Sequence, residues 1–351
     1  MSSVSFRCGP VVALRHPAPW WLGVLLAWAL CACAAPRPSQ SPAGIGDFGE
    51  TAFAAVRAEP AVATTALPEV PGLSRVQFEG FDAVQLDAPQ GTAVIALFGG
   101  HLLSYVPRGG QEVLWLSPLS PRPPAPVRGG VPVLWPYFSR QGQRADMPAH
   151  GLVRTLPWQV VSAERAEDGA LTVVMAPPAL PGLGLSLRMT VRLGTALEQT
   201  LLTTNTGTAP VRFTEALHTY YRVGDALQVR VQGLDGAAYR EKSEGFANAY
   251  RQRGDWSLAD IGGHADRLYA GTGGDHVLVD PVLHRRIHLR TDGSNSLVTW
   301  NPGVAAETRS PDVGTGWRHF LCLETANAGA DVVELAPGAQ HRLVQRISVA
   351  P

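Results

Sequence analysis

A histidine in the middle of a strand-like segment is one residue of this sequence that could exchange protons with a bound molecule. Residues 214–225 form the run TEALHTYYRVGD, and strand alternation places Ala216, His218, Tyr220 and Arg222 on one face. Imidazole titrates near neutral pH, so His218 could act as a general acid or base. A core histidine hydrogen-bonded to a carbonyl is the structural alternative, and this segment alone leaves both interpretations open.

A glutamate occupies a comparable position in a second apolar segment. Residues 320–328 form the run FLCLETANA, in which Phe320, Cys322 and Glu324 share one face. A carboxylate is costly to bury unless it is paired or hydrogen-bonded, although a glutamate at a strand end can also turn to water. If Glu324 and His218 face one pocket, they provide a general base and a general acid.

Aromatic residues and an arginine are concentrated in a third segment, residues 127–138. This run, VRGGVPVLWPYF, places Arg128 before a Gly-Gly turn and contains Trp135 and Tyr137 between two prolines and a phenylalanine. Flat apolar surfaces beside fixed polar groups suit a sugar ring, whose C–H faces are apolar and whose edges carry hydroxyls.

The following segment adds a histidine and a second arginine. Residues 147–158, MPAHGLVRTLPW, contain His150 and Arg154. A guanidinium can bind an anion through two parallel hydrogen bonds, so Arg128 and Arg154 are candidates for holding one. Lys242 is the only lysine among 29 basic residues, which indicates a general preference for arginine, and either arginine could instead be a solvated surface residue.

Composition and motifs argue against several classes of function. The formal net charge is +0 without a basic run, so no nucleic-acid partner is expected. Dinucleotide, P-loop and G-x-S-x-G motifs are not found. His284 and His288 are four residues apart but on a predicted strand, and Cys322 is the only cysteine after residue 33. We therefore expect no metal site and no disulfide in the folded body.

The elements that position these residues are predicted to be strands. From residue 74 onward, short period-two segments such as 185–194 (LSLRMTVRLG) and 341–350 (HRLVQRISVA) are separated by Gly, Pro, Asn and Asp turns. No segment keeps a helical apolar stripe over the length of a full helix. We predict an all-β fold, a large antiparallel β-sandwich that forms one domain over residues 74–351.

The N-terminal segment predicts export. Residues 1–33 combine two arginines, a short apolar run and the sequence LCAC, which is similar to a bacterial lipobox with Cys33 as the lipidated residue. Plain secretory cleavage beside it is the alternative. Residues 34–73 are rich in proline and alanine, which is typical of a tether. The sequence thus predicts a periplasmic, lipid-anchored protein that meets the membrane only through Cys33.

Seven segments in a fixed order resemble one enzyme family. They are GGHLLSYVP with EVLWLSP, RGGVPVLWPYF, PAHGLVRTLPW, ALHTYYRVGD, DRLY, VTWNPG and FLCLETA. Together they resemble the hexose-6-phosphate mutarotases, also called glucose-6-phosphate 1-epimerases, of the aldose 1-epimerase superfamily. The resemblance covers residues 76–349 and implies the galactose mutarotase-like form of the antiparallel β-sandwich.

The same resemblance implies roles for individual residues. His218 and Glu324 match the catalytic histidine and glutamate of the family. Arg128 and Arg154 match arginines that bind the substrate phosphate.

Two further positions match residues that contact the sugar. Asp266 of DRLY matches a carboxylate that binds sugar hydroxyls, and His150 lies where a pocket histidine is expected. Ala149 stands where some members have a glutamine that contacts the substrate, so this part of the contact set differs.

The implied reaction interconverts the α- and β-anomers of a hexose 6-phosphate through the open-chain aldehyde. Glu324 is expected to act as base and His218 as the acid at the ring oxygen, without metal or cofactor. The expected partner is a small sugar or sugar phosphate, and the protein is expected to be a monomer. The alternatives are an exported mutarotase for unphosphorylated sugars and a non-catalytic carbohydrate-binding envelope lipoprotein.

Overall fold

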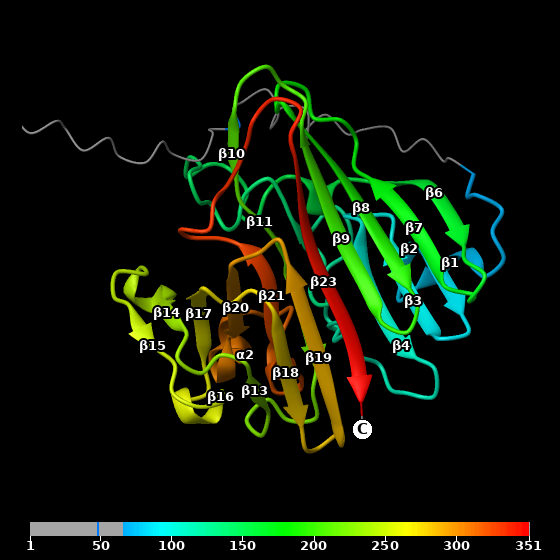
Figure 1. Ribbon diagram of the computed structural model, residues 1–351. Helices are drawn as coiled ribbons and strands as arrows, with labels where there is room; N and C mark the ends of the chain where they lie inside the picture. The colour runs from blue at the N-terminus through cyan, green and yellow to red at the C-terminus, as the bar shows by residue number, and fades with distance from the viewer. Residues whose placement is uncertain (1–47, 49–65, 351) are drawn as a thin grey trace, which may run out of the picture. The chain divides into compact units, whose positions relative to one another are not determined.

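The structure is a computed structural model, and it describes residue 48 and residues 66–350. Within this part of the chain, the strands form four sheets of four, two, eight and nine strands, and the strand pairs in these sheets are antiparallel (Figure 1). The predicted all-β antiparallel architecture is confirmed.

The nine-stranded sheet is the longest layer of the described residues, and Figure 1 shows β23 between β9 and β19. Its strands, in spatial order, are β16 (Trp256–Ser257), β13 (Arg230–Gln232), β18 (Asp275–Asp280), β19 (Arg285–Asp292), β23 (Gln340–Ala350), β9 (Leu197–Asn205), β8 (Leu185–Leu193), β7 (Leu171–Ala176) and β6 (Gln159–Arg165).

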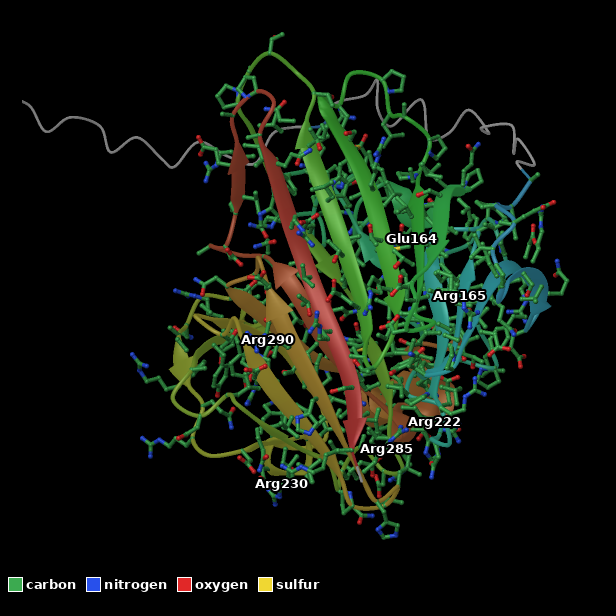
Figure 2. The ribbon with its side chains drawn as sticks, turned by 45° about the vertical axis from the view of Figure 1, so that its right-hand side comes forward. Glu164, Arg165, Arg222, Arg230, Arg285 and Arg290 are labelled. Atoms are coloured by element: carbon green, nitrogen blue, oxygen red, sulfur yellow. The ribbon has the colours of Figure 1, made fainter. Side chains whose placement is uncertain are left out.

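Alternation along these strands separates a core face from an exposed face. In β19, Ile287 and Leu289 are buried, whereas Arg286, His288 and Arg290 are exposed. Figure 2 shows Arg290 on the exposed side of the sheet. A period-two pattern of this kind requires one buried and one solvated face, as the sequence predicts.

The eight-stranded sheet carries the candidate site. Its strands, in spatial order, are β15 (Tyr250–Arg251), β14 (Ala238–Glu241), β17 (Ala265–Ala270), β20 (Ser296–Asn301), β21 (Phe320–Asn327), β11 (Glu215–Leu217) and β5 (Val133–Leu134), and β12 (Tyr220–Arg222) also pairs with β21.

The remaining strands form two smaller sheets. The four-stranded sheet consists of β1 (Leu73–Phe78), β2 (Phe81–Ala88), β3 (Gly91–Ala96) and β4 (His101–Pro107), and the two-stranded sheet of β10 (Val211–Phe213) and β22 (Val333–Leu335). Short helices connect the strands: η1 (Val153–Thr155), η2 (Lys242–Glu244), η3 (Ala259–Ile261), η4 (Gly303–Ala305), α2 (Ala306–Arg309) and η5 (Gly314–His319).

The core lies between the nine-stranded sheet and one face of the eight-stranded sheet. Leu343 and Ile347 of β23 belong to the same apolar cluster as Leu321 and Leu323 of β21. Each fully buried side chain of this size stabilises the fold by about 1.5–3 kcal/mol. The opposite face of the eight-stranded sheet is therefore available to build a site.

The predicted boundaries fall partly outside the described residues. The signal segment, residues 1–33, and most of the tether, residues 34–73, cannot be compared with the structure. Strand β1 begins at Leu73, beside the predicted start of the domain at residue 74. Phe48, which the sequence places in the tether, is buried, and its ring stacks 6.3 Å from Tyr137. No helix in the described part of the chain is long and apolar enough to cross a membrane.

Candidate active site

The face of the eight-stranded sheet opposite the core is organised in rows that run across its strands. Asp266, Trp300, Cys322 and Tyr220 are directly paired neighbours and form one row, which we call the catalytic row. Glu324 lies two residues beyond Cys322 on β21, so alternation returns it to the same face. Four different strands thus bring residues that are far apart in the sequence onto one surface.

The predicted strand over residues 214–225 is divided in two. Strands β11 and β12 both pair with β21, and His218 and Thr219 lie in the break between them. The His218 backbone N–H donates to the Pro132 carbonyl at 3.1 Å, whereas the Thr219 hydroxyl donates to Gln345 in the core at 2.7 Å. His218 and Thr219 therefore still lie on opposite faces of the sheet, as alternation predicts, although the strand is broken between β11 and β12.

His218 and Glu324 form a buried pair at the centre of this surface. The His218 Nε2 atom is 3.3 Å from the Glu324 Oε1 atom, with 12% and 2% of the two side chains exposed. His218 Nδ1 and Glu324 Oε2 are buried without a hydrogen-bond partner among the described residues. Because buried polar atoms normally have partners, these two atoms are suited to bind a ligand.

Burial shifts both groups toward their neutral forms. The pKa of His218 is lowered well below its usual value, first by burial and then by the charges of His150 and Arg128. The pKa of Glu324 is raised well above its usual value by burial and by Asp266. Both shifts favour the arrangement in which the carboxyl group carries the proton and the imidazole is neutral.

Aromatic rings fix the orientation of the His218 imidazole. The Tyr220 ring stacks on it with centroids 4.8 Å apart and an interplanar angle of 8°, and the Trp300 ring meets it edge-on at 5.8 Å. The His150 ring is a third neighbour at 5.9 Å. Trp300 and Tyr220 also give the site the flat apolar walls that a sugar ring requires.

Arg128 is held beside these rings by two hydrogen bonds. Its Nε atom donates to Asp312 Oδ2 at 2.7 Å, and its Nη1 atom donates to the Tyr220 hydroxyl at 2.9 Å. Its guanidinium carbon lies 6.0 Å from the Trp300 ring centroid. An arginine held in this way presents its remaining N–H groups to a ligand with little loss of side-chain entropy.

Arg154 and His150 approach the same site from a neighbouring loop. The Arg154 Nη2 atom donates to the Ala149 carbonyl at 2.9 Å, and burial together with the charge of Arg128 lowers the pKa of Arg154 to about 10. His150 has a φ of 67°, which is uncommon for a residue other than glycine, and burial lowers its pKa to about 3. Two guanidinium groups close enough to repel each other favour an anion between them.

Asp266 is paired with the single lysine of the chain. The Lys242 Nζ atom lies 3.0 Å from Asp266 Oδ2. Burial raises the pKa of Asp266, and the Lys242 charge opposes that shift. Asp266 therefore lies at the end of the catalytic row with a half-exposed cation beside it.

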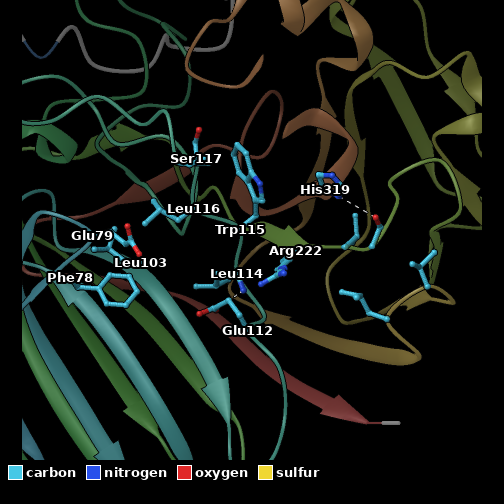
Figure 3. Close-up of a pocket in the computed structure, with 15 residues that line it drawn as sticks. Phe78, Glu79, Leu103, Glu112, Leu114, Trp115, Leu116, Ser117, Arg222 and His319 are labelled. Atoms are coloured by element: carbon cyan, nitrogen blue, oxygen red, sulfur yellow. Dashed lines mark hydrogen bonds between the residues drawn. The ribbon is translucent and has the colours of Figure 1, made fainter. Parts of the chain in front are cut away.

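A separate cavity of about 760 Å³ lies next to Trp115 and is lined by none of the six predicted site residues (Figure 3). It includes Arg222, which the sequence places on the face of His218. The half-buried acid that lines it, Glu112, already accepts hydrogen bonds from the backbone N–H groups of Tyr105 and Leu114, both at 2.9 Å. We therefore place the candidate active site at the His218–Glu324 pair and not in this cavity.

The comparisons with known proteins identify the family. A sequence model of the family described as aldose 1-epimerase matches residues 82–348, which is most of the chain. The chain belongs to the aldose 1-epimerase family. The predicted resemblance is thereby confirmed at the level of the family and of the fold.

Curated relatives and a solved structure extend this assignment. A protein of Escherichia coli strain K12, named provisionally as a glucose-6-phosphate 1-epimerase, is 34% identical over 287 residues, which cover 80% of this chain and 94% of the relative. A Salmonella typhimurium protein with the same name is 33% identical over 289 residues. The crystal structure of a provisionally named mutarotase from Salmonella typhimurium has a TM-score of 0.71 at 29% identity and covers 85% of this chain and 99% of that chain.

These relatives contradict the prediction of a periplasmic, lipid-anchored protein. The body of this chain corresponds to 94% of the E. coli and Salmonella relatives, which are named for a phosphorylated sugar and not as envelope proteins. The prediction rested on residues 1–33 and on Cys33, which lie outside the described residues and before the family match begins at residue 82. A short apolar run with a small-residue motif carries too little information to decide location against these relatives.

The structure brings the six predicted site residues into one region and adds three that sequence reasoning missed. Trp300 lies in the quoted segment VTWNPG but received no role. Composition alone accounts for Lys242 in the sequence, although a unique lysine in an arginine-rich chain is unusual. Asp312, which fixes Arg128, follows no motif and could be found only from the fold.

Proposed function

We propose that this protein interconverts the α- and β-anomers of a hexose 6-phosphate such as glucose 6-phosphate. The observation that supports the proposal most directly is the buried His218–Glu324 pair, 3.3 Å apart, beside two arginines. The names of the curated relatives point to the same substrate.

Ring opening requires a proton to leave the anomeric hydroxyl O1 and a proton to reach the ring oxygen O5. Transfer of the pair's proton from Glu324 to His218 gives a carboxylate and an imidazolium. Glu324 then accepts the proton of O1 while His218 donates its proton to O5, so the C1–O5 bond breaks and C1 becomes an aldehyde. O1 and O5 are both bonded to C1, so two groups 3.3 Å apart can reach both.

Reclosure after rotation about the C1–C2 bond reverses these transfers on the other face of the aldehyde. The enzyme that accompanies the open-chain sugar has a protonated Glu324 and a neutral His218, which is the state that burial favours. Each proton transfer of this kind contributes about 10²–10⁴-fold in rate. We assign Arg128 and Arg154 to the 6-phosphate, where binding energy remote from C1 orients the reacting atoms.

Two-dimensional exchange NMR on glucose 6-phosphate tests the proposal. The protein should increase the exchange between the two anomeric signals, and His218→Ala should abolish that increase while circular dichroism remains unchanged. Equal acceleration for glucose and glucose 6-phosphate would show that the enzyme does not recognise the 6-phosphate. Saturable sugar binding without any acceleration would identify a carbohydrate-binding protein in place of an enzyme.

A further inference from the structure

A second cavity, of about 670 Å³, adjoins the candidate site. Phe138 and Lys242 line this cavity and also contact site residues. The Phe138 ring meets the His150 ring edge-on at 5.5 Å, and Lys242 pairs with Asp266 at 3.0 Å. The cavity therefore lies beside the site, with Phe138 and Lys242 between them.

Small residues on the same sheet face form the floor of this cavity. Ala238, Ala270 and Ser296 are directly paired across β14, β17 and β20, and all three line the cavity. Ala270 and Ser296 are each two residues along their strands from the larger Leu268 and Val298, on the face that also carries Glu324. The change from large to small side chains along these strands leaves space for the cavity beside the proposed sugar site.

The lining of the cavity combines apolar surface with an excess of positive charge. Phe138, Phe246 and Leu268 are among the apolar lining residues. Arg140, Arg240 and Lys242 also line it, against one acidic lining residue, Asp331, and Lys242 is paired with Asp266 of the site. The Asp331 carboxylate already accepts hydrogen bonds from the Asn295 backbone N–H at 2.7 Å and from the Asn327 amide at 3.0 Å. The cavity volume of about 670 Å³ falls within the range of about 300–1,000 Å³ typical of ligand pockets.

We propose that this cavity is a second sugar subsite, which binds an anionic glycosyl unit attached to the reacting hexose. The inference rests on the proposed function, because the reacting hexose must occupy the catalytic row. The apolar C–H faces of the second ring would pack on the phenylalanine walls, and its anionic group would face the three cations. A second ring attached through a hydroxyl near Asp266 leaves C1 free to react. The substrates would then include reducing disaccharides with an anionic second ring.

Anomer exchange of three sugars tests the subsite. Exchange NMR is run on glucose, on maltose and on maltose 6′-phosphate, whose phosphate is on the non-reducing ring. We expect kcat/KM to rise in this order, by about tenfold at each step, because each added group gains contacts in the cavity. Equal values for the three sugars would overturn the proposal.

A filling variant separates the subsite from the catalytic groups. Ala238→Trp should return maltose 6′-phosphate to the glucose value and leave glucose and glucose 6-phosphate unchanged. Ala247→Trp, at an exposed position that does not line the cavity, should change none of them. If Ala238→Trp fails to fold, Ala270→Phe, on the neighbouring strand and more exposed, provides the same test.

A binding measurement distinguishes failure of this inference from failure of the proposed function. Saturation-transfer NMR should show protein contacts to both rings of maltose 6′-phosphate in the unmodified protein, and contacts to the reducing ring alone in Ala238→Trp. Contacts to both rings without exchange of any sugar would sink the enzymatic proposal and keep the subsite. Exchange of glucose 6-phosphate without contacts to the second ring would sink the subsite alone.

Discussion

Two buried histidine–glutamate pairs lie on opposite faces of the eight-stranded sheet, and their geometry is nearly the same. His218 Nε2 is 3.3 Å from Glu324 Oε1 on the site face, and His341 Nε2 is 3.5 Å from Glu215 Oε1 on the core face. Strands β11 and β21, which carry Glu215 and Glu324, are neighbours. Distance and burial alone would therefore assign both pairs the same role.

Their remaining partners distinguish the two pairs. Glu215 Oε2 accepts a hydrogen bond from the Thr203 hydroxyl at 3.2 Å, and His341 Nε2 lies 3.0 Å from the Asn327 side-chain oxygen. Glu324 Oε2 has no such partner within the described part of the chain. Glu215 Oε1 also has no hydrogen-bond partner in the described residues, but it faces His341 at 3.5 Å. The two pairs therefore differ in the carboxyl oxygen turned away from the histidine, which is hydrogen-bonded in the core pair and left for a ligand in the site pair. A catalytic pair is recognised by what is left unsatisfied around it, not by its own separation.

The largest expected difference between the pairs is in catalysis. Glu324→Gln keeps the shape of the side chain but removes the group that accepts the O1 proton, so anomer exchange on glucose 6-phosphate should fall by about 10²–10⁴-fold. Exchange NMR measures this. The variant should melt near the temperature of the unmodified protein, because burial already favours the neutral carboxyl group and glutamine keeps its shape. Full activity in this variant would show that the base has been assigned to the wrong residue.

The second largest effect concerns the arginines, which accompany the site pair. Arg128→Leu removes charged hydrogen bonds to the phosphate, each contributing about 1.5–3 kcal/mol, so kcat/KM for glucose 6-phosphate should fall by about 10–100-fold. Exchange of glucose should remain unchanged. Arg290→Leu, on the exposed face of the nine-stranded sheet, is the matched control. Equal losses on both sugars would instead mean that Arg128 acts through the rings beside His218.

A smaller effect on kinetics is expected when the hydrogen bond between Arg128 and the Tyr220 hydroxyl is removed. Tyr220→Phe keeps the ring that stacks on His218 but removes the hydroxyl that accepts from Arg128. The loss of one hydrogen bond that positions Arg128 should raise KM for glucose 6-phosphate about 2–10-fold, with kcat nearly unchanged. Steady-state kinetics separate the two constants. A fall in kcat alone would place the hydroxyl in the chemical step.

The sequence predicted the faces of the site strands but not which polar residues are unsatisfied. Alternation is a local property of a strand, so the sides assigned to His218 and Glu324 followed from their own segments, and the ordered motifs then favoured the catalytic interpretation. The same alternation places Glu215 on the face opposite His218, and the structure shows it there. Its partner His341 is 126 residues away, and no local pattern links the two.

Residues that act through long-range pairing could not be predicted in the same way. Lys242 reaches Asp266 because β14 pairs with β17, and Asp312 reaches Arg128 across 184 residues. Both contacts depend on sheet register and loop closure, which a period-two pattern does not determine. The small-residue floor at Ala238 is invisible in the sequence for the same reason, since its neighbours come from other strands.

The smallest expected effect on activity belongs to the core pair. Glu215→Gln should leave anomer exchange within about twofold of the unmodified protein, because its carboxyl contacts no proposed substrate atom. Its effect should appear in stability instead. Burial raises the pKa of Glu215 from 4.5 to about 8, with the Thr203 hydroxyl opposing the shift. Burial lowers the pKa of its partner His341, while Asp331 opposes that shift.

The sign of the pH dependence follows from this shift. Between pH 4.5 and about 8 the folded chain keeps the Glu215 proton and the unfolded chain does not, so the stability it contributes is full below pH 4.5 and is lost as the pH rises to about 8. The loss is about 1.4 kcal/mol for each pH unit in that window. Urea unfolding from pH 5 to 9 should therefore show Glu215→Gln becoming progressively more stable relative to the unmodified protein. If Glu215→Gln instead reduces exchange as strongly as Glu324→Gln, the two pairs act as one proton network through the sheet, and the distinction between them fails.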